Sequence, residues 1–273
     1  MRRFAALTLA ALLAGAPLVA AEADDIVAVR LIDGGRTPEG VHMAAVEIRL
    51  APGWHTYWRA PGMNGVPPLF DWSGSGNLAA VAQEWPRPVV FESFGLPTIG
   101  YKDTVVLPVL LTPAAADAPI EARLEFSYGV CRDICIPKAA RLAAVLEAGP
   151  GGASAGDRAA IESALARRPL DGAAAGVAAA RCSLDAEGAG YRILAEVDFA
   201  AAPPGDVLAV IEAEDRPDLW ISDAETSVAG RSLRASARID ALGPGALAVD
   251  RSALRLTLLS PDRAIDIRGC PAR

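Results

Sequence analysis

Apolar and polar residues along this chain mostly alternate with a period of two or form short apolar runs, a pattern typical of β-strands. Clusters of proline, glycine and asparagine separate these segments, as expected for turns between strands. In the first half of the chain the expected strands are 26–32, 41–50, 78–85, 104–111, 120–128 and 139–146. In the second half they are 178–184, 191–199, 207–212, 232–239, 254–259 and 264–267. Many short strands with turns between them predict β-sandwiches.

One stretch between the two halves breaks this pattern. Residues 149–156 contain only glycine, alanine, serine and proline, a composition that supplies no core, so a linker is expected there. Residues 157–168 then show helical spacing, with Ile161 and Leu165 on one face. Asp157 is expected to cap this short helix.

The amino-terminal segment has the pattern of a secretory signal peptide. Two arginines precede an apolar run from Phe4 to Ala20, and the small residues Val19 and Ala21 suit a cut after Ala21. No later stretch holds eighteen apolar residues free of charges, so no stable membrane insertion is expected. The mature protein is therefore expected to be soluble in an oxidising compartment, where paired cysteines form disulfides or redox groups.

These patterns together predict an all-β protein of two β-sandwich domains, joined by a glycine-rich linker and one short helix. The expected divisions are a signal peptide (1–21), a first sandwich (22–148), the linker with the helix (149–175) and a second sandwich (176–273).

Composition and charge exclude several classes of protein. Hydrophobic residues make up 52 % and charged residues 22 % of the chain, which excludes disorder over most of its length. The formal net charge is −7, whereas a nucleic-acid-binding protein needs a basic surface, so no nucleic-acid partner is expected. Four cysteines and two histidines leave few ligands for a metal, and no metal or other cofactor is expected.

Cys131 and Cys135 form the first of two cysteine pairs. Four extended steps would separate their Cα atoms by roughly 13–14 Å, whereas a disulfide needs about 4.4–6.8 Å, so the three-residue spacer must turn. Because Pro137 favours extended geometry at Ile136, we expect a strand, a tight turn and a strand rather than a helical turn. Closing so small a loop adds about 2 kcal/mol of stability, and such a bond is easily reduced.

Three interpretations of this pair stay open on spacing alone. The pair is a redox-active dithiol, a structural staple in a hairpin, or two ligands of a metal. His55, His42 or Met63 would have to complete a metal site, and their positions do not form the spacing of a ligand set. Of the neighbouring charges, Arg132 would favour a thiolate and Asp133 would oppose it.

Cys182 and Cys270 form the second pair and enclose almost the whole second domain. A disulfide that closes a loop of this size adds about 4–5 kcal/mol. We therefore expect a structural disulfide that ties the ends of the domain together. A second redox couple is the alternative, and no neighbouring residue supports it.

Three segments of the first half carry a resemblance to a known family. They read Gly-Trp-His-Thr-Tyr-Trp-Arg (53–59), Phe-Glu-Ser-Phe-Gly (91–95) and Tyr-Gly-Val-Cys-Arg-Asp-Ile-Cys-Ile-Pro (128–137). Together they resemble the amino-terminal periplasmic domain of the thiol:disulfide interchange protein DsbD and, more closely, the related ScsB-type proteins. The resemblance covers residues 26–147.

The resemblance implies an immunoglobulin-like sandwich with redox cysteines at a strand-turn-strand edge. It implies a periplasmic thiol-disulfide oxidoreductase that works in the reductase direction without a cofactor. A membrane-embedded thiol reductase would donate electrons to Cys131 and Cys135, which would reduce periplasmic disulfide-containing proteins. The spacer of DsbD is longer, and because the chain has no electron carrier in a membrane, the donor is expected to be another polypeptide.

The resemblance also implies residues that flank the site. Phe94 matches an aromatic that lies over the disulfide in the family, and Glu92 matches an acidic residue of the same cap segment. Ser93 stands where DsbD usually has a second acid. His55 and Tyr57 match aromatic residues beside the site. By the same analogy Cys135 is the attacking cysteine.

A different class of function competes with the redox interpretation. In it the protein is a non-catalytic periplasmic binding or adaptor module whose two disulfides are both structural. An indirect role in copper-stress tolerance, through repair of metal-oxidised thiols, is a further alternative suggested by the ScsB-type proteins alone.

Overall fold

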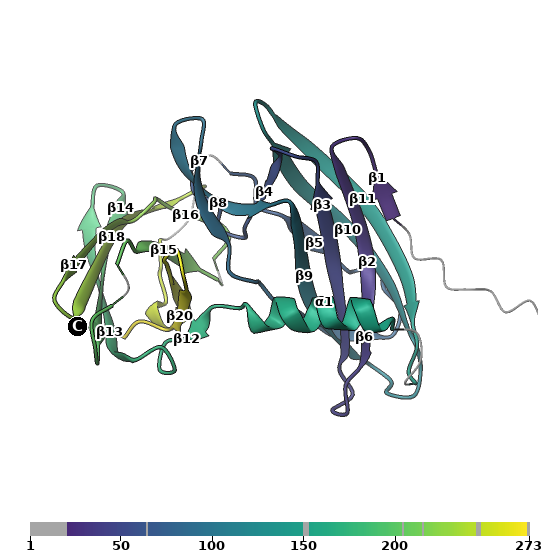
Figure 1. Cartoon of the computed structure of the whole chain (residues 1–273). Coiled ribbons are helices and arrows are strands. Elements are labelled where there is room, and N and C mark those ends of the chain that lie inside the picture. Colours follow the sequence, from purple (N-terminus) through teal and green to yellow (C-terminus); the bar gives the residue numbers. More distant parts are fainter. Residues whose placement is uncertain are drawn as a thin grey trace, which may run out of the picture.

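The computed structural model describes residues 21–63, 65–149, 153–203, 205–214, 216–243 and 247–271. It consists of four β-sheets that form two sandwich-like bodies, with one short α-helix (Figure 1). The all-β expectation is therefore confirmed. The predicted signal peptide lies outside the described residues except for Ala21, and the predicted domain boundaries stay predictions. Among the described residues, no helix has the length and apolar character needed to cross a bilayer.

The first body packs a five-stranded sheet against a six-stranded one. The five-stranded sheet has the order β1 (Ala21–Ala23), β2 (Val27–Arg36), β3 (His42–Leu50), β9 (Thr104–Pro113), β6 (Leu78–Gln83). The other sheet has the order β11 (Cys135–Leu146), β10 (Ile120–Cys131), β4 (His55–Tyr57), β8 (Leu96–Lys102), β7 (Val89–Ser93). A further strand, β5 (Leu69–Asp71), pairs with β10.

Alternation along β10 shows why these residues form a sandwich. Its side chains are buried and exposed in turn, so Leu124 and Phe126 face the core while Glu121 and Glu125 face solvent. Buried residues of the opposite sheet complete the core of the first body, among them Val29, Leu31, Val46, Ile48, Leu107 and Val109.

The helix α1 (Ala155–Ala166) begins two residues earlier than expected. Ser154, not Asp157, is its N-cap, because the Ser154 hydroxyl accepts a hydrogen bond from the Asp157 backbone N–H at 3.0 Å. Asp157 lies in the first turn, where its negative charge interacts favourably with the positive end of the helix dipole. Its carboxylate also pairs with Arg30 at 2.9 Å. Ile161 and Ala164 are fully buried.

This helix covers the outer face of the five-stranded sheet. It lies across β2, β3 and β9, as Figure 1 shows. Ile161 and Ala164 pack there with Ile32, Ala45 and Val106 in a small apolar cluster of their own. The first body therefore has a third layer on this side.

The second body also contains two sheets. One has the order β12 (Leu170–Asp171), β20 (Ala264–Arg268), β19 (Leu254–Leu259), β15 (Leu208–Ala213), in which β12 and β20 run parallel. The other has the order β13 (Val177–Glu187), β14 (Gly190–Phe199), β18 (Ser232–Ala241), β16 (Leu219–Ile221), and β17 (Glu225–Ala229) pairs with β18. A 3₁₀ turn, Arg251–Ala253, precedes β19.

A disulfide joins Cys182 and Cys270, which are 88 positions apart in the sequence. Cys182 lies on β13 and Cys270 follows β20, so the bond ties the beginning of the second body to its end. Both cysteines are buried within the core of this body, together with residues such as Ile193, Val197, Leu233 and Leu256.

Candidate functional site

A tight hairpin holds Cys131 and Cys135. Cys131 is the last residue of β10, Cys135 is the first of β11, and the two are direct partners in the ladder. A disulfide joins them, with their Cα atoms 4.2 Å apart. The expected strand, tight turn and strand are therefore confirmed.

The two cysteines differ in their exposure. Cys131 is 0 % exposed, whereas Cys135 and the three residues of the turn are exposed. An incoming sulfur therefore has access to Cys135 from solvent, and Cys131 lies behind it against the sheet.

Tyr57 contacts both sulfur atoms of this disulfide. The Tyr57 hydroxyl oxygen lies 2.8 Å from Cys131 Sγ and 3.2 Å from Cys135 Sγ. Because the sulfurs of a disulfide carry no hydrogen, the hydroxyl is the donor. The ring has room there because Gly129 has no side chain: a Cβ at Gly129 would lie 3.1 Å from Tyr57 Cε2. Burial raises the pKa of Tyr57, so its hydroxyl keeps its proton at neutral pH. After reduction the same hydroxyl can donate to a thiolate, which lowers the pKa of that thiol.

His55 lies beside Tyr57 on the same strand and is the ladder partner of Cys131. Its ring meets Tyr57 and Phe91 edge-on, with centroid distances of 5.6 and 4.8 Å. Burial, and secondarily the positive charge of Lys102, lower the pKa of His55. The lowered pKa favours the neutral form of His55 at pH 7.

The lowered pKa of His55 predicts a pH-dependent loss of stability. As pH falls below about 6.5, His55 gains a proton in the unfolded chain before it does so in the folded one, which favours unfolding. We expect wild-type protein to lose more free energy of unfolding than His55→Phe between pH 7 and pH 5. Urea denaturation at both pH values measures this. Both proteins keep His42, so the second histidine does not affect the difference, and equal losses would contradict the prediction.

The β7–β8 hairpin lies on the other side of β4 from the cysteine hairpin. Phe94 and Gly95 make its turn, with φ of 54° and 78°, the left-handed conformations of a two-residue hairpin turn. Phe94 is 58 % exposed at this tip, and Glu92 is also exposed. The aromatic that packs against His55 is Phe91, earlier in the same motif, and Lys102 Nζ lies 4.4 Å from the centre of its ring. The motif contains both Phe91 and Phe94, and its sequence did not indicate which of the two packs against His55.

The charges in the turn offset each other. Arg132 Nε pairs with Asp133 Oδ2 at 2.8 Å, and both side chains are exposed. The Arg132 guanidinium also lies over the ring of Trp54, 5.2 Å from its centre. Because the positive charge is paired within the turn, neither residue alone sets the charge beside the sulfurs.

Comparison with known protein families matches residues 28–147 to the family described as "Thiol:disulfide interchange protein DsbD, N-terminal". This part of the chain is similar to the DsbD amino-terminal domain family. The match contains the whole cysteine hairpin, β4 and the β7–β8 hairpin, and it ends before α1 and the second body. The site is therefore built from residues of the matched region alone.

The fold also resembles a solved structure, described as the crystal structure of the N-terminal periplasmic domain of ScsB from Proteus mirabilis. The TM-score is 0.72, and the alignment covers 94 % of this chain and 99 % of that one at 20 % sequence identity. The likeness concerns the fold, and it extends over both bodies and so beyond the DsbD family match. No curated protein matches the chain.

In the part of the chain that the structure describes, no group of three or more His, Cys, Asp or Glu side chains is arranged so that it could hold a metal ion. Of the sequence-predicted flanking residues, the DsbD-like site brings Tyr57 and His55 to the disulfide. Phe94 and Glu92 lie on the neighbouring hairpin.

Proposed function

We propose that this protein is a periplasmic thiol-disulfide exchange protein that passes electrons from a membrane-embedded reductase to disulfide-containing partner proteins. The observation that supports it best is the contact of the Tyr57 hydroxyl with both sulfurs of a disulfide whose Cys135 end is exposed. A buried structural staple needs neither an exposed cysteine nor a hydrogen-bond donor aimed at its sulfurs.

In the proposed reaction the reduced protein carries two thiols, and the exposed Cys135 attacks as a thiolate. Its sulfur forms a bond with one sulfur of the partner's disulfide, and the other partner sulfur leaves as a thiolate and takes a proton. Cys131 then attacks Cys135 Sγ, which re-forms the hairpin disulfide and releases the second partner thiol. Two electrons pass to the partner, and a membrane reductase restores the dithiol. Tyr57 stabilises the thiolate by donating its hydroxyl proton in a hydrogen bond.

We assign the β7–β8 hairpin the role of a cap beside this dithiol. Phe94 at its tip and Glu92 beside it would cover Cys135 when no partner is bound and move aside on docking. The turn suits this role because it is joined to the sheet only through β8, and β7 is the edge strand. Phe91 on His55 anchors the base of the same hairpin.

A redox titration tests the proposed function. The two disulfides are equilibrated with glutathione or dithiothreitol buffers, and each cysteine pair is quantified by alkylation and mass spectrometry. We expect the Cys131–Cys135 bond to have a potential above about −300 mV, the range of catalytic disulfides, and Cys182–Cys270 to lie below it. A potential below that value for Cys131–Cys135 as well would overturn the proposal in favour of a non-catalytic binding module.

A further inference from the structure

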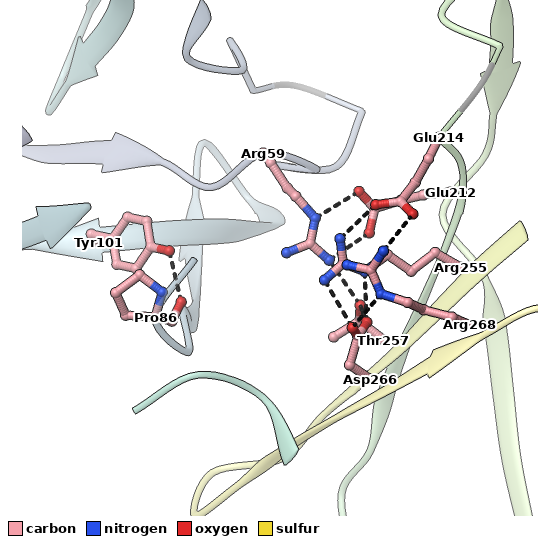
Figure 2. Close-up of polar contacts among 9 residues, drawn as sticks. All are labelled: Arg59, Pro86, Tyr101, Glu212, Glu214, Arg255, Thr257, Asp266 and Arg268. Carbon is pink, nitrogen blue, oxygen red and sulfur yellow. Dashed lines mark hydrogen bonds and ion pairs between the residues drawn. The ribbon is translucent and has the colours of Figure 1, made fainter. Parts of the chain in front are cut away.

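Arg59 links the two bodies and lies two residues after the end of β4, the strand that carries Tyr57. Its guanidinium forms a two-pronged pair with Glu212 of β15: Nε donates to Oε1 at 2.9 Å and Nη2 to Oε2 at 2.8 Å. Nη2 also donates to the hydroxyl of Thr257 on β19 at 3.0 Å (Figure 2). The Arg59 and Glu212 side chains are only 11 % and 17 % exposed, so this is a largely desolvated contact rather than a surface ion pair.

A second set of charges on the other body adjoins the partners of Arg59, since the Thr257 hydroxyl donates to Asp266 Oδ1 at 3.4 Å. Asp266 accepts two hydrogen bonds from Arg255, at 2.6 and 2.9 Å, and Glu214 accepts one at 2.6 Å. Arg268 pairs with Glu214 at 3.3 Å (Figure 2). With Arg59 and Glu212 the cluster contains three arginines and three carboxylates, a balance that the loss of Arg59 would break.

The segment after Arg59 lies between the second body and Tyr57. A Cβ at Gly65 would lie 2.9 Å from Tyr57 Cδ1, so this backbone packs directly on the ring that reaches the sulfurs. A Cβ at Gly62 would lie 3.4 Å from Asp223 Oδ1 of the second body, so the segment also approaches that body. A cavity of about 530 Å³ lies between this segment and the second body, and Met63 and Trp220 are among the residues that line it.

Because a cavity adjoins it, the segment is not held by close packing alone. The Pro61 carbonyl accepts one hydrogen bond from the Ile99 backbone at 3.2 Å. The Arg59 guanidinium lies 3.9 Å from the centre of the ring of Trp58, a residue that is fully buried. Ala60 packs against the core cluster of the first body, which also includes Leu259 and Ala264 of the second. The pair with Glu212 adds a directional polar contact that ties the start of the segment to the second body.

We propose that Arg59 is a positioning residue, through which the second sandwich holds residues 59–63 and 65–66 against Tyr57 and so keeps the Tyr57 hydroxyl at the redox sulfurs. The inference rests on the proposed function and gives the second body a part in it. It predicts that loss of Arg59 changes the reactivity of Cys135 although Arg59 itself touches neither cysteine.

The test measures the alkylation rate of Cys135 in reduced protein against pH, with iodoacetamide as the probe. Tyr57→Phe is expected to slow alkylation at pH 7 about three- to tenfold, as the loss of one hydrogen bond to the thiolate implies, and to raise the apparent thiol pKa. Arg59→Met should likewise slow alkylation at pH 7 and raise the apparent thiol pKa. The double variant should react no more slowly than Tyr57→Phe alone, because coupled residues are not additive.

Control variants separate positioning from general loosening of the two bodies. Arg87 also bridges them, since its Nη1 donates to the Pro261 carbonyl at 3.0 Å, but it lies outside the segment that begins at Arg59. Arg87→Met should leave the alkylation profile unchanged. If Arg59→Met does not fold, Glu212→Gln removes the same charge pair from the other side and is expected to slow alkylation as well.

Three results would overturn the inference: a folded Arg59→Met with the wild-type profile, an Arg59 effect that adds in full to that of Tyr57→Phe, or an equal effect of Arg87→Met. None of these changes the potential of the wild-type Cys131–Cys135 bond. The failure of this inference is therefore distinguishable from the failure of the proposed function.

Discussion

Cys131→Ala protein is expected to accumulate mixed disulfides with its periplasmic partners, while Cys135→Ala protein accumulates fewer by a factor of about ten or more. The reason is access. In Cys131→Ala the remaining thiol is the exposed Cys135, with the Tyr57 hydroxyl 3.2 Å from its sulfur. In Cys135→Ala the remaining thiol is Cys131, which is 0 % exposed. The trapped species are counted on non-reducing gels after alkylation in the native compartment, and mass spectrometry identifies the partners.

Two controls accompany this experiment. The double variant Cys131→Ala, Cys135→Ala should trap nothing, which shows that Cys182 and Cys270 do not contribute. Reaction of each purified single variant with a small aromatic disulfide measures access to the thiol without a docking step. Equal trapping by the two single variants, or faster reaction of Cys131, would contradict the assignment of Cys135 as the attacking residue.

Removal of the Cys182–Cys270 bond should cause the largest loss of stability among the disulfide variants. The bond closes a loop of 88 positions, for which the loop-closure entropy is about 4–5 kcal/mol, against about 2 kcal/mol for the hairpin bond. Both cysteines also pack within the core of the second body, so alanines there leave small cavities. We expect Cys182→Ala, Cys270→Ala to unfold at much lower urea concentration than Cys131→Ala, Cys135→Ala.

Urea denaturation followed by circular dichroism gives the midpoints for this comparison. Hydrogen exchange read by mass spectrometry shows where stability is lost, and the loss should be confined to strands β13 to β20. A larger effect of the hairpin double variant on stability would reverse the expected roles of the two disulfides.

Local pattern predicted most of the fold. The long strands alternate clearly, and β10 is the best example, because each exposed residue is followed by a buried one over most of its length. The strands that were not expected are short or irregular: β4 and β16 have three residues each, and β8 contains Pro97. A segment of three residues is too short for alternation to be recognised, and its strand conformation comes from pairing with neighbours.

The candidate site was predictable only in part, for the same physical reason. The spacing of Cys131 and Cys135 is local, and together with Pro137 it was enough to predict a hairpin. The approach of Tyr57 to their sulfurs depends on the pairing of β4 with β10, across more than seventy residues of sequence. The Arg59–Glu212 pair joins residues 153 positions apart, and nothing near either of them in the sequence indicates the other.

The position of α1 has a consequence for how this protein is divided into fragments. The family match ends at residue 147, yet Ile32, Ala45 and Val106 of the matched region are covered by a helix that begins at Ala155. A piece truncated at the homology boundary would present this apolar strip to water and to other copies of itself. The part of the chain that folds on its own is therefore expected to extend to about residue 166. It includes one helix that the family match, which ends at residue 147, does not contain.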